Sequence, residues 1–180
     1  MRGPSRAELR GYAGRTVAPI IAPRLSVLFC GINPGLYTAW AGHHFARPGN
    51  RFWPVLHRSG FTPRLLVPAE QRELLTLGLG VTNVVERATA TAAELSAAEL
   101  REGGRQLEQT ASRYQPAYVA ILGVTAYRAA FDEPKAMLGL QQRRLGRSRV
   151  WVLPNPSGLN AHYQPPELAE RFAELRSAAF

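Results

Sequence analysis

The sequence predicts an α/β fold, a three-layer α/β/α sandwich around a mainly parallel sheet of four to five strands. Short apolar runs carry Gly, Pro or Asn at or near their carboxyl ends, as buried parallel strands do. Helical patterns alternate with these runs. The expected strands are residues 25–31, 80–85, 117–123 and 149–154. The expected helices are residues 50–59, 68–77, 96–113, 124–131 and 165–178.

The first 24 residues are rich in Arg, Pro and Gly, and only residues 7–12 suggest a short helix. We therefore expect residues 1–24 to form a basic, loosely ordered N-terminal arm. Residues 25–180 contain no internal repeat, low-complexity tract or linker, which predicts a single domain of ordinary size.

The helix expected at residues 96–113 has the clearest pattern. Ser96 followed by Glu99 forms a capping box that marks its start. Gly103 and Gly104 lie inside it, and each Gly costs about 1 kcal/mol relative to Ala. We therefore expect another segment to approach the helix backbone closely at this pair of glycines.

The charge of the chain is strongly positive, with a net formal charge of +9. Basic side chains displace counterions from phosphate backbones, so this charge favours a polyanionic partner such as a nucleic acid. Lys135 is the only lysine among 22 basic residues. A compositional bias of the genome could explain Arg in place of Lys, but not the excess of basic over acidic residues.

A single cysteine, Cys30, excludes an intramolecular disulfide and suits a reducing compartment. No apolar run reaches the roughly 18 residues of a membrane helix. We expect a soluble, intracellular protein without a membrane partner, cytoplasmic and associated with the nucleoid if it is bacterial. The neighbouring His43 and His44 point apart and lack a third ligand at metal spacing, so we expect no metal site.

Loops after the parallel strands are where an open α/β sheet builds its site, here residues 31–50, 83–95 and 154–163. Asn33 lies in the first, between a strand and Pro34-Gly35. It is either part of an ordinary turn or an amide held to orient a water molecule. Phe45 is an apolar ring that could stack on a planar ligand. Phe52 and Trp53 open a helix and are expected in the core.

The third loop carries Leu159 after a flexible glycine. This leucine is either an apolar tip that enters a base stack or an ordinary cap on the core. The sequence pattern alone leaves both interpretations open.

Six segments in this order resemble the family of mismatch-specific uracil-DNA glycosylases and thymine-DNA glycosylases, within the uracil-DNA glycosylase superfamily. The resemblance spans about residues 25–175, and the segments are specific only jointly. They are residues 31–35, Phe45 with residues 50–53, and residues 81–87, 99–105, 120–123 and 153–159.

The resemblance implies that Asn33 positions the hydrolytic water and that Phe45 stacks on the extruded uracil. It also implies that backbone groups near Ile32 and Phe45, and the amide of Asn83, contact the base. The wedge that replaces the flipped nucleotide would be the loop Ser157, Gly158, Leu159 and Asn160, which we call the 157–160 loop.

Two departures from the family pattern matter. The usual Ser-Arg continuation of the wedge is Asn160-Ala161 here, which affects the contact expected with the orphaned guanine. Ala93 stands where relatives carry a polar, catalytically relevant residue. It indicates a weakened enzyme, by natural drift or by engineering.

The activity implied is that of a monofunctional hydrolase in base excision repair of DNA damage. It would flip uracil from G·U mispairs in double-stranded DNA and leave an abasic site by water attack. It would act as a monomer without a cofactor. The alternative is a non-catalytic or weakly active mismatch-binding or lesion-binding DNA module on the same scaffold. A nucleotide-binding α/β protein is disfavoured because no phosphate-cradling glycine motif is present.

Overall fold

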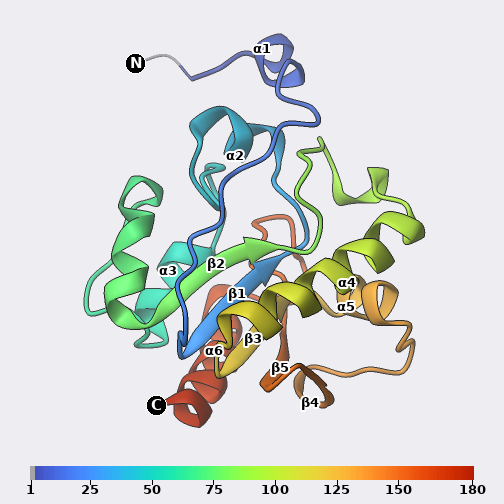
Figure 1. Ribbon diagram of the computed structural model, residues 1–180. Coiled ribbons are helices and arrows are strands. Elements are labelled where there is room, and N and C mark those ends of the chain that lie inside the picture. The colour runs from blue at the N-terminus through green and yellow to red at the C-terminus, as the bar shows by residue number, and fades with distance from the viewer. Residues whose placement is uncertain (1–2) are drawn as a thin grey trace.

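A five-stranded sheet forms the middle layer of the structure, a computed structural model that describes residues 3–180 (Figure 1). Its strands lie in the order β2-β1-β3-β5-β4, and all are parallel except β4, which pairs antiparallel with β5. The strands are β1 (Val27–Gly31), β2 (Leu79–Asn83), β3 (Tyr118–Leu122), β4 (Gly139–Leu145) and β5 (Ser148–Leu153). The predicted α/β class and the mainly parallel sheet are therefore confirmed.

Helices cover both faces of this sheet. On one face α4 (Ala97–Tyr114) packs beside α5 (Val124–Phe131), and on the other α3 (Phe52–Arg58) packs beside α6 (Pro165–Ala179). The 3₁₀ helix η1 (Pro68–Leu77) lies on the same side as α3. Phe52 and Trp53 are buried in the core, as predicted. Short helices complete the structure: α1 (Arg6–Arg10), α2 (Leu36–Ala41) and the 3₁₀ turn η2 (Ala92–Glu94).

Besides the three-residue η2, two elements have no counterpart among the segments that the sequence predicts. Edge strand β4 has the sequence Gly-Leu-Gln-Gln-Arg-Arg-Leu and largely alternates between half-buried and exposed positions. An edge strand does not need a continuous apolar run, so a search for such runs misses it. Helix α2 has only six residues, and its N-cap residue, Gly35, has no side chain to cap the helix. Such a helix leaves little sequence pattern to detect.

The glycine pair in α4 explains how closely this helix packs on its neighbours. A Cβ atom at Gly103 would overlap the carbonyl of Val84, and one at Gly104 would lie 2.6 Å from the carbonyl oxygen of Ala130. The predicted close approach is confirmed at both positions. Helix α4 therefore packs directly against the segment after β2 and against α5.

The segment before β1 is bonded to the domain. Ile20 is buried and exchanges backbone hydrogen bonds with Val81, both at 2.8 Å. The backbone N–H of Gly14 donates to Ala88, and the N–H of Ala88 donates to Arg15. These bonds attach the second half of the expected arm to β2 and to the loop beyond it. The division into an arm and a domain stays a prediction.

Candidate active site

A cavity of about 340 Å³ opens where the strand order reverses. The chain passes from β1 to β2 on one side and then returns to β3 on the other side of β1. In open α/β sheets, ligands bind outside the carboxyl ends of the strands at such a point. The first predicted loop supplies residues 31–35, and Asn83, Leu122 and Asn155 come from the ends of the neighbouring strands.

The polar side chains that line this cavity are uncharged, apart from one arginine. Among the residues that the structure describes, no carboxylate lines it. Amides and hydroxyls can donate and accept hydrogen bonds without changing charge, so they suit a neutral polar ligand. The polar side chains are Asn33, Thr38, His44, Arg47, Asn50, Asn83, Thr89, Thr91, Asn155 and Ser157.

The amide of Asn33 is held in one orientation by three oxygen atoms. Its Nδ2 lies 3.0 Å from the carbonyl oxygen of Arg87, 3.2 Å from that of Pro34 and 2.7 Å from Oγ1 of Thr89. Because the Thr89 hydroxyl donates its own proton to the carbonyl of Thr91, it must accept from Asn33. Within residues 3–180, Oδ1 of Asn33 has no hydrogen-bond partner. That oxygen can accept a hydrogen bond from a water molecule.

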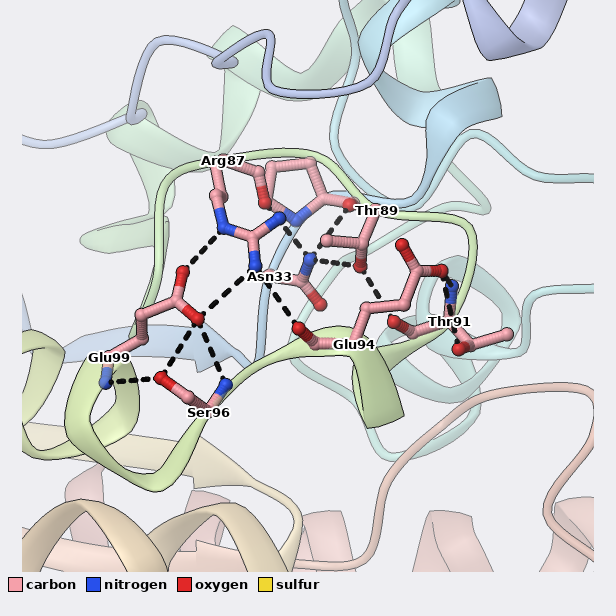
Figure 2. Close-up of polar contacts among 8 residues, drawn as sticks. Asn33, Arg87, Thr89, Thr91, Glu94, Ser96 and Glu99 are labelled. Atoms are coloured by element: carbon pink, nitrogen blue, oxygen red, sulfur yellow. Dashed lines mark hydrogen bonds and ion pairs between the residues drawn. The ribbon is translucent and has the colours of Figure 1, made fainter.

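Two of the three partners of Asn33 come from the second predicted loop. Arg87 directly precedes residues 88–95, which we call the 88–95 loop, and Thr89 lies within it. Backbone bonds join the two strand ends, from Val85 to Ile32 at 2.9 Å and from Thr89 to Pro34 at 3.1 Å. Figure 2 shows the Arg87 and Thr89 oxygens converging on the Asn33 amide.

An ion pair joins this loop to helix α4. Nε of Arg87 lies 2.5 Å from a carboxylate oxygen of Glu99, and a terminal guanidinium nitrogen donates to the carbonyl of Glu94 at 3.1 Å (Figure 2). The Arg87 hydrogen bond and those from Ser96 lower the pKa of Glu99 to about 2. Glu99 is therefore ionised across the physiological range, and the pair is permanently charged.

Phe45 and Asn83 approach each other over Gly31. A Cβ atom at Gly31 would lie 2.7 Å from Oδ1 of Asn83 and 3.3 Å from the Phe45 ring. The Phe45 ring stacks on Phe52, with 4.0 Å between centroids. Its backbone has a φ of 54°, which is unusual outside glycine and is retained only where the surroundings enforce it.

His44 supplies much of that enforcement. It is buried, and its ring Nε2 lies 2.9 Å from the carbonyl oxygen of Ala18. Its backbone N–H donates to Oε1 of Gln71 at 2.8 Å. The indole of Trp53 donates to the His44 carbonyl at 3.1 Å. Burial lowers the pKa of His44, so the ring is held neutral.

The 157–160 loop borders the same cavity, and its tip is free. Leu159 is 75% exposed and lines the opening. The loop base is held by Arg51, whose guanidinium donates to the carbonyls of Tyr163 at 2.8 Å, Asn160 at 3.1 Å and Gly158 at 3.4 Å. A Cβ atom at Gly158 would overlap the carbonyl of Gly49. The ordinary core cap considered for Leu159 is therefore not what the structure shows.

The structure thus brings together most of the residues singled out in the sequence. Asn33, Ile32, Phe45, Asn83, Ser157 and Leu159 all line the first cavity. Gly158 and Asn160 form the rest of the 157–160 loop. Ala93 is exposed in η2 and is not among the lining residues, whereas its neighbour Ala92 is.

Sequence reasoning missed the residues that hold the others in place. These are Thr89, Arg87 and Glu99 behind Asn33, Gln71 and His44 behind Phe45, and Arg51 behind the 157–160 loop. The capping box at Ser96 and Glu99 was a detectable signal, but it predicts only a helix start.

A second cavity of about 600 Å³ lies next to the first and shares Ile32 and Asn155 with it. It is lined by the start of α5 and by Met137, Tyr163 and Arg171. It contains neither Asn33 nor Phe45, so we assign the candidate site to the smaller cavity.

Two further properties bear on the site. Over residues 3–180, no cluster of three or more His, Cys, Asp or Glu side chains is placed to hold a metal ion. The helices in that range are all too short or too polar to cross a membrane.

Comparison with known proteins gives two findings. The sequence model of the Uracil DNA glycosylase superfamily matches residues 18–176. The solution NMR structure of a candidate uracil DNA glycosylase from Methanosarcina acetivorans is similar in fold, with a TM-score of 0.57 and 17% sequence identity. That similarity covers 91% of this chain and 98% of the archaeal one. At this identity the likeness supports the fold alone.

Proposed function

Because the chain belongs to the uracil DNA glycosylase superfamily, we propose that it hydrolyses the N-glycosidic bond of uracil in double-stranded DNA. G·U mispairs are the preferred substrate and an abasic site is the product. The observation that carries this proposal is the Asn33 amide, fixed by three oxygens with its own oxygen available at the cavity.

Breaking the glycosidic bond creates positive charge on the sugar and negative charge on the departing uracil. The site must supply hydrogen-bond donors to the base and a water molecule beneath the sugar. Asn33 cannot remove a proton at neutral pH, but its oxygen can orient the water for attack. Positioning and electrostatics, rather than general base catalysis, then supply the rate enhancement.

Uracil has a planar ring with a donor N–H between two carbonyl acceptors. The Phe45 ring would stack on its face, and the Asn83 amide can donate and accept along its edge. Ile32 would contribute through its backbone next to Asn33. This recognition needs neither a metal nor a cofactor.

The uracil must leave the double helix before it reaches the cavity. Flipping costs a few kcal/mol, and the cost is smallest in a mismatch, so part of the G·U preference belongs to the DNA. The exposed Leu159 would fill the gap, and Ser157, Gly158 and Asn160 would give the wedge its shape. The net charge of +9 favours binding to DNA inside the cell, and a single chain contains every group invoked.

Incubation of the protein with a G·U duplex, followed by alkaline strand cleavage, tests the proposal. We expect strand cleavage at the target base, strongest for uracil in G·U, weaker for uracil in A·U or in a single strand and for thymine in G·T, and lost in Asn33→Ala. Absence of cleavage above background in every duplex would contradict the proposal.

The alternative is a non-catalytic or weakly active mismatch-binding module. The absence of a carboxylate among the described lining residues favours it, because no Asp or Glu there can act as a general base and burial lowers the pKa of the lining histidine, His44. Tight binding to a G·U duplex without any excision would support this alternative.

Substitution at position 93 tests whether the missing polar side chain limits the excision rate. We propose that a carboxylate there assists the reaction, so Ala93→Asp should raise the excision rate. Ala92→Asp is the matched control, because Ala92 lines the cavity and Ala93 does not. A rise in the control alone would assign the polar position to residue 92, and no rise in either variant would contradict an assisting carboxylate.

A further inference from the structure

Arg87 takes part in the site through both its backbone and its side chain. Its carbonyl oxygen accepts from Nδ2 of Asn33 at 3.0 Å. Its guanidinium donates to both carboxylate oxygens of Glu99, at 2.5 and 3.2 Å, and to the carbonyl of Glu94 at 3.1 Å. One residue therefore connects the Asn33 amide, the end of the 88–95 loop and helix α4 (Figure 2).

Glu99 is itself fixed at the first turn of α4. Its carboxylate accepts from the backbone N–H of Ser96 at 2.9 Å and from the Ser96 hydroxyl at 3.0 Å, and its own N–H donates to that hydroxyl. The two glycines of α4 pack this helix tightly on the segment after β2 and on α5. The carboxylate that holds Arg87 is thus attached to the rigid part of the domain.

Backbone hydrogen bonds hold the start of the 88–95 loop, from Thr89 to Pro34 at 3.1 Å and from Ala88 to Arg15 at 2.8 Å, but they do not reach its middle. Residues 90–94 are exposed, and η2 is only three residues long. Thr89 is buried and forms the shortest bond to Asn33, at 2.7 Å, but it lies inside this loop. The backbone of Thr89 is bonded to Pro34 on one side, and on the other side the loop is held where the Arg87 guanidinium donates to the Glu94 carbonyl.

We propose that Arg87 and Glu99 are positioning residues for Asn33: their ion pair fixes the 88–95 loop so that the Arg87 carbonyl and the Thr89 hydroxyl aim the amide at the water. The proposal rests on the proposed function for its kinetic part. A misplacement of about 1 Å at a reacting centre can cost about 100-fold in rate. The pair therefore matters for the chemical step even though partly exposed ion pairs contribute little to global stability.

Two variants weaken the contacts of the pair while keeping the helix start. Glu99→Gln retains a residue that is suitable for the capping box but loses the charge that holds Arg87. Arg87→Lys keeps the charge but cannot reach Glu99 and the Glu94 carbonyl together. The matched controls are Glu102→Gln and Arg105→Lys, which make the same changes in an exposed ion pair on the same helix.

Single-turnover excision at saturating enzyme gives the rate of the chemical step. We expect Glu99→Gln and Arg87→Lys to lower it by about 10-fold to 100-fold. Affinity for a duplex with non-hydrolysable 2′-fluorodeoxyuridine, and the melting temperature, should stay close to those of the controls. A parallel loss of rate, affinity and melting temperature would indicate a merely structural role and overturn the proposal.

The double variant with Asn33→Ala tests whether the pair acts through Asn33. In that background, Glu99→Gln should change the residual rate by less than about 2-fold, because the residues act as one unit. The same fold loss as in the wild-type background would show that the pair acts elsewhere.

The side-chain amide signals of Asn33 give a readout that does not require excision. They are assigned in a nitrogen–proton correlation spectrum as the pair of signals lost in Asn33→Ala. Glu99→Gln should shift or broaden them, and Glu102→Gln should not. If the wild type excises no uracil but this pattern holds, only the proposed function fails. If the signals do not move, the positioning proposal fails whatever the activity.

Discussion

The two sides of the cavity differ in how they are held. On the Asn33 side, the reactive amide itself is fixed by three oxygens, and the ring of Phe45 is stacked on Phe52. On the 157–160 side, Arg51 holds the loop base through backbone carbonyls, while the Leu159 side chain is 75% exposed. The groups proposed for chemistry are therefore preorganised in the free protein, whereas the proposed wedge finds its contacts only in DNA.

The largest effect is expected from breaking the preorganised side. Asn33→Ala removes the only amide proposed to hold the water, so excision should fall by about 100-fold or more. Duplex affinity should hardly change, because Asn33 is a half-buried residue of the cavity and is not part of the exposed 157–160 loop. Single-turnover kinetics with a parallel binding titration provide the check. Full activity would mean that the water lies elsewhere.

A smaller effect on excision is expected from shortening the exposed side chain of Leu159 in the 157–160 loop. Leu159→Ala removes apolar surface that would be buried in the base stack, which corresponds to about 10-fold in processing of paired duplex. Single-stranded uracil has no gap to fill, so its rate should change little. Leu65→Ala, another exposed leucine, is the control. An equal loss on duplex and single strand would argue against a wedge.

Loosening the base of the 157–160 loop should have a still smaller effect. Arg51→Lys keeps the charge but loses the planar group that reaches three carbonyls, so we expect about a 3-fold loss on duplex substrate from the weakened hydrogen bonds. Arg58→Lys, at the far end of α3, is the matched control. A loss of melting temperature without a change in excision would show that Arg51 serves only the fold.

The smallest expected effect is a loss of folding stability at acidic pH, caused by His44 on the Asn33 side of the cavity. Burial lowers the pKa of His44, so the unfolded chain binds a proton more readily than the folded one. Stability from the neutral ring should be complete above the unfolded pKa of about 6.5 and should decline as the pH falls below it. Urea unfolding at several pH values, with His44→Gln beside the wild type, measures this. An identical pH dependence in both proteins would contradict it.

The layers could be predicted because buried parallel strands appear as apolar runs in the sequence. Glycine, proline and capping residues mark where the helices between these strands begin and end. Strand β4 was missed because an edge strand may be polar, as Gln141 to Arg144 are. Helix α2 was missed because it is short and lacks a side-chain cap.

The candidate site divides in the same way. The turn around Asn33 and the exposed tip at Leu159 are local features that the sequence pattern shows directly. The resemblance to the family, whose segments occur in the same order, assigned both of them to one site. Two of the three partners of Asn33 are 54 and 56 residues away and act through a carbonyl and a hydroxyl. Any residue type supplies a carbonyl, so such a contact leaves no pattern in the sequence. The same holds for the Arg51 bonds to the backbone of residues 158–163.

One experiment tests the contrast between the two sides directly. Single-turnover excision is measured for the wild type, Asn33→Ala and Leu159→Ala, each on a G·U duplex and on single-stranded uracil. We predict that Asn33→Ala loses activity by the same large factor on both substrates, while Leu159→Ala loses it on the duplex alone. Equal losses for Leu159→Ala on both substrates, or retained activity in Asn33→Ala, would contradict the assignment of chemistry to one side and DNA wedging to the other.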